Sequence, residues 1–159
     1  SDVCSSDLLD GEVVTNTSVN TRRHHGMAHI PEDRIHMGLN LKTDLDENVI
    51  LSRQRDKGFN KFGFIRRKKV SELAGDIINE FDVHGAKPGG SVDTLSGGNM
   101  QKIVVGRELS HKPDFIIANQ PTRGLDVGSI EFVHRTLIEA RDRGAAILLV
   151  SVELDEIMS

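Results

Sequence analysis

Two apolar runs in the last third of the chain constrain its fold more than any other feature. Residues 115–118 read Phe-Ile-Ile-Ala and residues 145–150 read Ala-Ala-Ile-Leu-Leu-Val, with no polar residue inside either run. Unbroken runs of this length are typical of parallel strands covered on both faces. Residues 129–143 between them predict a crossover helix whose apolar stripe consists of Ile130, Val133, Leu137, Ile138 and Ala140. We therefore expect a βαβ unit in an α/β fold with a parallel sheet.

The loop after the first of these strands is a candidate ligand site. It reads Asn-Gln-Pro-Thr-Arg-Gly-Leu-Asp from residue 119 to residue 126. Open α/β sheets bind their ligands at the carboxyl ends of the strands. We therefore expect polar residues of this loop to face a ligand.

A second candidate site lies where another helix is expected to begin. Ser96, Gly97 and Gly98 stand directly before an apolar-periodic segment, residues 100–109. The Ser96 hydroxyl can cap this helix, and glycines let an anion approach the backbone N–H groups closely. Unpaired N–H groups and the helix dipole favour negative charge there, which predicts a phosphate-binding surface. By themselves, the three residues fit an ordinary glycine-rich turn equally well.

Upstream, the pattern predicts one more strand and a compact helical region. Residues 26–31 form a short apolar strand that ends at a proline, and a charged loop, residues 32–34, follows it. Residues 46–51 begin a helix with acidic residues in its first turn. Residues 70–81 place apolar side chains along one helical stripe.

Two basic runs and one polar stretch carry less information. Residues 22–25 and 66–69 are interpreted as solvated helix faces, and residues 54–61 as a loop. The adjacent His24 and His25 cannot both face one metal ion from a helix, so no metal site is expected there.

Composition excludes several classes of function. The 159 residues carry a net charge of −4, and Trp and Tyr are absent, so we expect no nucleic-acid partner. A single cysteine excludes a disulfide framework and a cysteine-based zinc site. No apolar run approaches the roughly 18 residues of a membrane span, and no secretory signal is visible. A cytoplasmic protein is therefore expected.

The first eight residues differ in character from the rest. Residues 1–8, Ser-Asp-Val-Cys-Ser-Ser-Asp-Leu, resemble the translation of a common sequencing adapter. We expect them to be an artefact of sequence assembly, so that Cys4 says nothing about redox chemistry and native sequence before residue 9 is missing. The alternative is a genuine polar tail. The helix expected after Ser151 is interpreted as cut short at the other end of the chain.

The motifs occur in an order that resembles the nucleotide-binding domain of an ABC transporter ATPase. Residues 95–99, Leu-Ser-Gly-Gly-Asn, resemble the ABC signature. Residues 115–120 stand at the Walker B strand, and residues 123–126, Arg-Gly-Leu-Asp, at the D-loop. Residues 30–34 lie where the Q-loop belongs, and residues 148–152 where the switch-histidine strand belongs.

This resemblance implies a P-loop NTPase-like (RecA-like) core with a parallel sheet and an inserted α-helical subdomain. Residues 9–34 would be the end of the β-subdomain and the Q-loop region. Residues 35–110 would be the helical subdomain with the signature, and residues 111–159 the RecA-like core.

Several positions depart from the family pattern. The Walker B strand of the family ends in Asp-Glu, which act near Mg²⁺ and on the attacking water, whereas Asn119 and Gln120 stand here. Glu32 replaces the Q-loop glutamine and Val152 replaces the switch histidine, so no catalytic set is intact. Because an amide cannot accept the proton of water, loss of the base alone lowers the rate about 10²–10⁴-fold. No phosphate-loop motif, G-x-x-x-x-G-K-[ST], is present; in the family it would precede residue 9.

The particular residues within these motifs narrow the resemblance to one group of ABC ATPases. Pro-Glu-Asp-Arg, Leu-Ser-Gly-Gly-Asn and Gln-Pro-Thr-Arg-Gly-Leu-Asp together resemble the second nucleotide-binding domain of fused ATPases that serve simple-sugar and nucleoside importers. The last of these motifs favours the nucleoside branch. The resemblance implies ATP as cofactor, with Mg²⁺ in the full-length protein. It also implies a location at the cytoplasmic face of the cell membrane, as a peripheral protein.

In this family two such domains bind two ATP molecules at a head-to-tail interface. The resemblance implies that Asp126 couples the two sites and that the ATP held by the first nucleotide-binding domain is bound by Ser96, Gly97, Gly98 and Asn99. Membrane permease subunits would dock on residues 35–110, and a substrate-binding lipoprotein would act indirectly.

Other interpretations stay open. The missing base fits a regulatory or structural ABC domain that does not hydrolyse ATP. Non-transport ABC ATPases of DNA repair or translation are a further class, but residues 35–94 carry no sustained heptads for a repair-type coiled coil. The 159-residue chain alone could also fold poorly and bind nothing.

Overall fold

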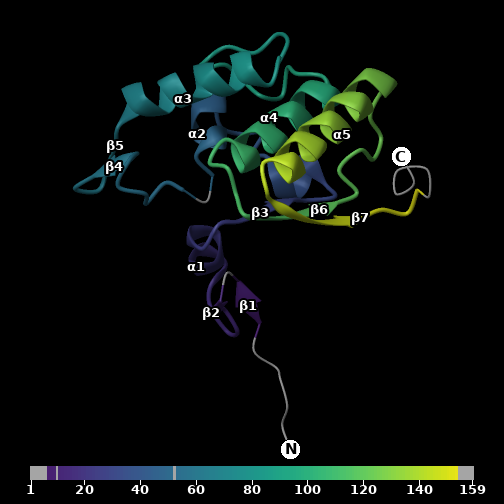
Figure 1. Ribbon diagram of the computed structural model, residues 1–159. Coiled ribbons are helices and arrows are strands. Elements are labelled where there is room, and N and C mark those ends of the chain that lie inside the picture. The colour runs from purple at the N-terminus through teal and green to yellow at the C-terminus, as the bar shows by residue number, and fades with distance from the viewer. Residues whose placement is uncertain (1–6, 10, 52, 154–159) are drawn as a thin grey trace, which may run out of the picture.

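A three-stranded parallel sheet forms one side of the molecule in the computed structural model, which describes residues 7–9, 11–51 and 53–153 (Figure 1). Its order is β3 (Met27–Ile30), β6 (Phe115–Asn119) and β7 (Ala146–Val150), so β6 is central. Ile30 pairs with Ala118, and Asn119 pairs with Val150. The strands expected from the two apolar runs and from residues 26–31 are thereby confirmed.

Helix α5 (Val127–Asp142) connects β6 to β7 and covers one face of the sheet together with α4 (Gly97–Leu109) (Figure 1). Most of α4 is buried because it also contacts α3 and β3. The stripe predicted for α5 is partly wrong: Ile138 is 44% exposed, whereas Phe132 is buried. Phe132 meets Phe81, which follows the last residue of α3, edge to face at 6.3 Å between ring centroids.

The helical region contains α2 (Leu45–Val49) and α3 (Arg67–Glu80), both near their predicted positions. Val70, Ala74 and Ile77 line the buried side of α3, as its apolar spacing predicts. The expected loop at residues 54–61 instead enters a small hairpin of β4 (Asn60–Lys61) and β5 (Phe64–Ile65). A one-turn π-helix, η1 (Arg34–Gly38), begins at the last residue of the expected charged loop, residues 32–34, and continues beyond it.

The N-terminal part consists of a hairpin of β1 (Leu8–Leu9) and β2 (Glu12–Val13), followed by α1 (Val19–His24) (Figure 1). Residues 1–6 of the expected adapter segment lie outside the described residues, and Leu8 pairs with Val13. The basic run 22–25 is not a purely solvated face, because the side chain of Arg23 is only 17% exposed and pairs with Glu108.

One hydrophobic core runs through both the sheet and the helical region. It joins Ile30 and Ile116 of the sheet to Ile77 of α3 and Ile103 of α4. The division of the chain at residues 34/35 and 110/111 stays a prediction. Within the described ranges, no helix has both the length and the apolar character that crossing a membrane requires.

Candidate functional site

The N-terminus of α4 is organised by two polar side chains. Ser96 is the N-cap, and its Oγ accepts hydrogen bonds from the Asn99 backbone N–H at 3.4 Å and from Asn99 Nδ2 at 3.0 Å. Asn99 Oδ1 in turn accepts a hydrogen bond from the His84 N–H at 2.9 Å. The expected cap is confirmed, and Ser96 stays exposed at the surface. At the start of α4, the Ser96 hydroxyl is therefore exposed, Gly97 is partly exposed, and Gly98 is buried.

Gly97 and Gly98 bring this helix start against two other segments. A Cβ on Gly97 would lie 2.7 Å from Arg34 Nη2. A Cβ on Gly98 would lie 2.2 Å from Ser129 Oγ and 3.1 Å from Asp126 Oδ2. Packing within this chain therefore requires glycine at position 98, whereas a Cβ on Gly97 would meet only the movable end of the Arg34 side chain. The close approach brings the predicted signature, Q-loop and D-loop segments together.

The Q-loop and D-loop segments are also joined to each other directly. Arg34 Nη1 donates a hydrogen bond to the Arg123 carbonyl at 3.0 Å, and Arg123 Nη1 forms an ion pair with Glu32. An open hollow of about 490 Å³ lies between these segments and is lined by Glu32, Asp33, Arg34, Ile35, Arg123 and Gly124. Glu32 thus forms an ion pair with a cation of the predicted D-loop, where a glutamine could only accept a hydrogen bond without a charge of its own.

Asp126 acts as the N-cap of α5. Its carboxylate accepts hydrogen bonds from the Ser129 N–H at 3.0 Å and from the Ser129 hydroxyl at 2.8 Å. These hydrogen bonds, the hydroxyl first, lower the pKa of Asp126 below its ordinary value. An ionised carboxylate therefore lies at the surface next to the start of α4.

Asn119, Gln120 and Val152 lie at the carboxyl ends of two neighbouring strands. Gln120 adopts a left-handed backbone conformation with φ 45°, and its N–H donates to the Val150 carbonyl at 2.7 Å. Val152, two residues beyond β7, is 79% exposed and has no polar side-chain atom. These side chains supply amide groups and a hydrocarbon but no proton acceptor of useful basicity.

Sequence reasoning missed Gln101, which ties the two candidate sites together. Its side chain is 3% exposed, and Nε2 donates a hydrogen bond to the Pro121 carbonyl at 2.7 Å. The loop after β6 is thereby held against the first turns of α4. No distinctive spacing marks a single buried amide on a helix, so no signal in the sequence indicates this contact.

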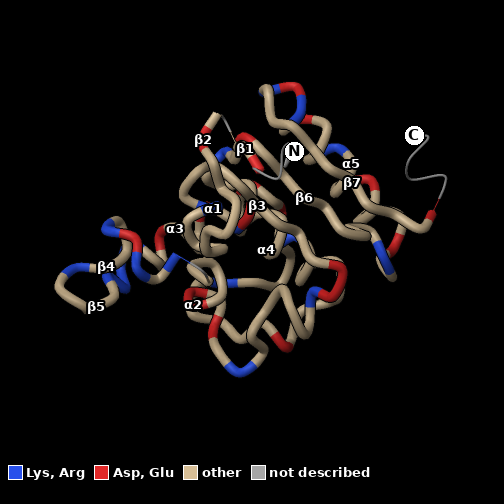
Figure 2. Tube along the Cα trace, turned by 90° about the horizontal axis from the view of Figure 1, so that it is seen from below, with Lys and Arg blue, Asp and Glu red and all other residues tan. Residues whose placement is uncertain are grey.

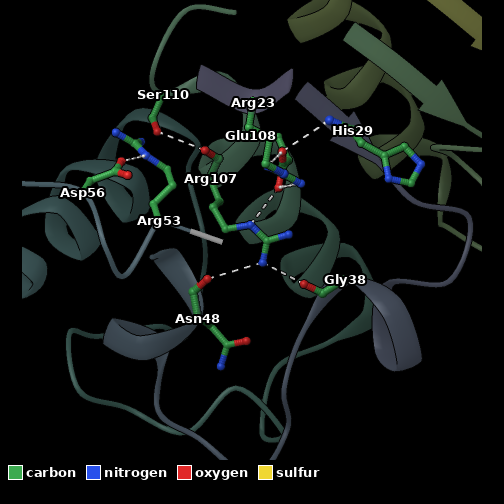
Figure 3. A network of polar contacts seen from close by, with 9 residues as sticks. All are labelled: Arg23, His29, Gly38, Asn48, Arg53, Asp56, Arg107, Glu108 and Ser110. Carbon is green, nitrogen blue, oxygen red and sulfur yellow. Dashed lines mark hydrogen bonds and ion pairs between the residues drawn. The ribbon is translucent and has the colours of Figure 1, made fainter. Parts of the chain in front are cut away.

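A buried ionic network behind the site was also missed (Figure 3). Glu108 on α4 is 1% exposed and accepts hydrogen bonds from Arg107 Nε at 3.0 Å and Arg23 Nη1 at 2.7 Å. Arg107 Nη1 donates to the carbonyl of Gly38, the last residue of η1, at 2.7 Å, and to the Asn48 carbonyl at 3.3 Å. The network therefore fixes the segment that follows Glu32–Arg34 against α4. Adjacent opposite charges within an otherwise apolar helix were its sequence signal.

The side chains of the site do not suit a metal ion by themselves. Among the residues that the structure describes, no group of three or more His, Cys, Asp and Glu side chains is placed to hold a metal. Mg²⁺ prefers carboxylate ligands, and Asn119 and Gln120 offer only amides where the resemblance places the metal-binding strand end.

Comparison with known proteins identifies the fold. No family model matches the chain. The ATP-binding cassette MJ0796, solved as a dimer in a post-hydrolysis state bound to ADP and Pi, is similar with a TM-score of 0.70 and 18% identity. The similarity covers 92% of this chain and 62% of that one. The α/β fold of an ATP-binding cassette domain, expected from the motifs, is thereby confirmed.

The amino-acid sequence is similar to those of several import ATP-binding proteins. The chain is 42% identical over 151 residues to the nucleoside import ATP-binding protein NupA of Lactococcus lactis subsp. cremoris. It is 43% identical over 151 residues to the guanosine import ATP-binding protein NupO of Bacillus subtilis. The chain is a homologue of nucleoside- and sugar-import ATP-binding proteins. The ribose import ATP-binding protein RbsA 2 of Rubrobacter xylanophilus is 36% identical over 149 residues.

These matches cover nearly the whole chain but only part of each importer protein. They span 95%, 95% and 94% of this chain, and 30%, 30% and 28% of NupA, NupO and RbsA 2. The expected resemblance to simple-sugar and nucleoside importer ATPases is confirmed. The roles of individual site residues in this import ATPase homologue stay predictions.

Proposed function

We propose that this chain is part of the ATP-binding, energy-coupling subunit of an ABC importer for nucleosides or simple sugars. The homologues are named for the import of nucleosides, guanosine and ribose. The two import proteins for nucleosides and guanosine are the more similar to this chain, which supports the nucleoside branch. On this proposal, the membrane permease is the main partner, residues 35–110 dock it, and the subunit lies at the cytoplasmic face of the membrane.

One observation carries the mechanism. The start of α4, with the exposed Ser96, lies beside the ionised carboxylate of Asp126, while the carboxyl ends of β6 and β7 carry no catalytic base. The N–H groups of Gly97 and Gly98 and the Ser96 hydroxyl would bind the γ-phosphate of an ATP molecule held by the first nucleotide-binding domain. Asp126, packed against Gly98, would couple that site to the second one. The base for hydrolysis would come from the other domain.

The second ATP site, at Asn119 and Gln120, would bind ATP but hydrolyse it slowly. Neither amide can accept the proton of the attacking water, and neither binds Mg²⁺ by charge. Mg²⁺ would therefore act at the site whose carboxylates the first domain supplies. Val152 offers no hydrogen bond to a γ-phosphate, which adds to the same asymmetry.

The experiment compares two substitutions in the full-length importer ATPase. Ser96→Arg blocks the phosphate-binding helix start, so it is expected to abolish ATP turnover. Gln120→Ala alters a strand end that has no base, so most turnover is expected to remain. Ser110→Arg, which adds the same side chain at the opposite end of α4, is the control. The asymmetric mechanism is wrong if Gln120→Ala stops turnover as completely as Ser96→Arg does.

A regulatory domain without hydrolysis is the second candidate function. The same three residues, Asn119, Gln120 and Val152, favour it for this half of the protein. It predicts that Ser96→Arg leaves the ATP turnover of the full-length protein unchanged.

A further inference from the structure

The hairpin between α2 and α3 exposes apolar side chains that nothing in the described chain covers. Every residue from 61 to 69 is exposed. Phe62 is 90% exposed, Phe64 79% and Ile65 40%. The hairpin projects from the body of the molecule beside α2 (Figures 1 and 2). Large apolar side chains that cluster at such a protruding tip indicate an interaction surface.

This tip lies within the most basic part of the chain. We name residues 55–69 the basic hairpin; it contains one acidic residue and seven cations: Arg55, Lys57, Lys61, Arg66, Arg67, Lys68 and Lys69. Its net charge is therefore +6, whereas the whole chain carries −4. Its acidic residue, Asp56, is already paired with Arg53 at 2.9 Å. Within the described ranges, none of the seven cations forms an ion pair. Figure 2 shows Lys and Arg gathered along the projecting segment.

The fold anchors the base of the hairpin and leaves its tip outside the core. Phe59 packs partly against the core, with the Arg53 guanidinium 5.4 Å from its ring centroid, and Val70 is buried. The Arg66 N–H donates to the Phe59 carbonyl at 2.8 Å and closes the base. Phe62 has a φ of 53°, a left-handed conformation that bulky side chains rarely adopt. Folding therefore gains little from an aromatic residue at this position.

We propose that the basic hairpin binds the surface of an anionic lipid bilayer. The side chains of Phe62, Phe64 and Ile65 would enter the headgroup region, and the flanking cations would pair with lipid phosphates. Apolar residues surrounded by Lys and Arg are the pattern of segments that bind this interface. The proposal rests in part on the proposed function, which places the chain at a membrane. The tip combines two phenylalanines with the aliphatic Ile65, which favours insertion into a bilayer over a nucleic acid, whose bases would stack only on the aromatic rings.

A tryptophan reporter tests where the tip lies. The chain has no Trp, so Phe62→Trp introduces a single indole at the tip. With vesicles that contain phosphatidylglycerol in phosphatidylcholine, its fluorescence is expected to shift to the blue, and brominated lipid should quench it. Val127→Trp, at a 72% exposed position on α5, is the control and is expected to show neither change. Equal responses of both variants, or no response of Phe62→Trp, would overturn the proposal.

Sedimentation with the same vesicles tests the two components separately, with no nucleotide or permease present. The 159-residue chain should bind these vesicles, bind them less at high salt, and not bind pure phosphatidylcholine. Phe62→Ser with Phe64→Ser should weaken binding about tenfold, by loss of apolar insertion. Changing four cations of the basic hairpin, residues 66–69, to Gln should weaken it about a hundredfold or more.

Matched controls exclude a general charge effect. In the control variant, four exposed cations outside the basic hairpin are changed to Gln together: Lys42, Lys87, Arg135 and Arg143. The vesicle binding of this variant is expected to stay within twofold of that of the unchanged chain. Far-UV circular dichroism of each variant shows that the fold is kept. Tighter binding to polyuridylate than to vesicles would overturn the proposal in favour of a nucleic-acid surface. Because the assay contains no ATP, its failure would leave the proposed ATPase function untouched.

Discussion

Glu108→Gln is the substitution whose effect follows most directly from the structure. Glu108 is 1% exposed and is the counter-charge for the guanidinium groups of Arg107 and Arg23. Gln removes the charge but keeps one acceptor oxygen, and Arg23 can turn part of its charge to solvent because its side chain is 17% exposed. The loss therefore falls near the lower end of the range for breaking a buried ion pair, about 3 kcal/mol.

Urea unfolding of the chain measures this loss. With an m-value of roughly 1–3 kcal/mol per M, the midpoint should fall by about 1–3 M. Glu139→Gln on the exposed side of α5 is the control and should change the free energy of unfolding by less than about 0.5 kcal/mol. A Glu108→Gln variant as stable as the control would refute the assignment of Glu108 as a required counter-charge.

The pH dependence gives a second test of the same residue. Burial alone would raise the pKa of Glu108, but Arg107 and then Arg23 outweigh burial and hold this pKa below its ordinary value. A lowered carboxyl pKa contributes stability above the unfolded value, about 4.3, and that stability is lost as the pH falls through the folded value. The difference between wild type and Glu108→Gln should therefore be constant from pH 7 to 5 and shrink below about pH 4.3.

Two further predictions concern packing and a histidine. Gly75→Ala should raise the free energy of unfolding by about 0.5–1 kcal/mol, because the new methyl in α3 meets nothing closer than Pro88 Cγ at 3.9 Å. Gly106→Ala should lower the free energy of unfolding by about 1–3 kcal/mol, because the methyl would lie 2.7 Å from Ile77 Cγ2. Urea unfolding measures both variants. Changes of the same sign in the two variants would contradict this account of the packing around α3 and α4. Burial lowers the pKa of His111, so stability should fall as the pH drops below about 6.5. Urea midpoints between pH 7 and 5 should show a shallower fall in His111→Gln, and an unchanged slope would contradict this cause.

Elements with long, regular apolar patterns could be predicted from the sequence. The runs at residues 115–118 and 145–150 form β6 and β7, and the stripe at residues 70–81 matches α3, because burial on two faces or on one helical side leaves a local periodic pattern. The cap at Ser96 was predictable for the same reason, since a cap depends on residues within one turn.

Features set by distant contacts could not be predicted in this way. Arg23 stands in a basic run that resembles a solvated face, and only the fold brings it to Glu108, 85 residues away in sequence. The spacing in α5 predicts Ile138 as buried, but it is exposed, whereas Phe132 is buried in contact with the distant Phe81. The hydrogen bond from Arg107 to Gly38, the last residue of η1, joins residues 69 apart in sequence and also has no local signal.

The candidate site likewise combines features that local sequence predicts with features that depend on distant contacts. The motif residues are visible in the sequence, but the contact of Gly97 with Arg34 and that of Gly98 with Asp126 join segments far apart in the chain. Gln101 was missed because a buried amide on a helix has no distinctive spacing. The resemblance to an ABC ATPase identified these segments but not their contacts within the chain, and packing explains why glycine is needed at position 98.

The proposed asymmetry between the two ATP sites is tested most directly by counting trapped nucleotide. The full-length importer ATPase is incubated with labelled ATP and vanadate, and the labelled ADP retained per protein molecule is measured. Because the helix start at Ser96 would complete a competent site while Asn119 and Gln120 supply no base, one ADP per molecule is expected. Two trapped ADP molecules, or none, would contradict the account.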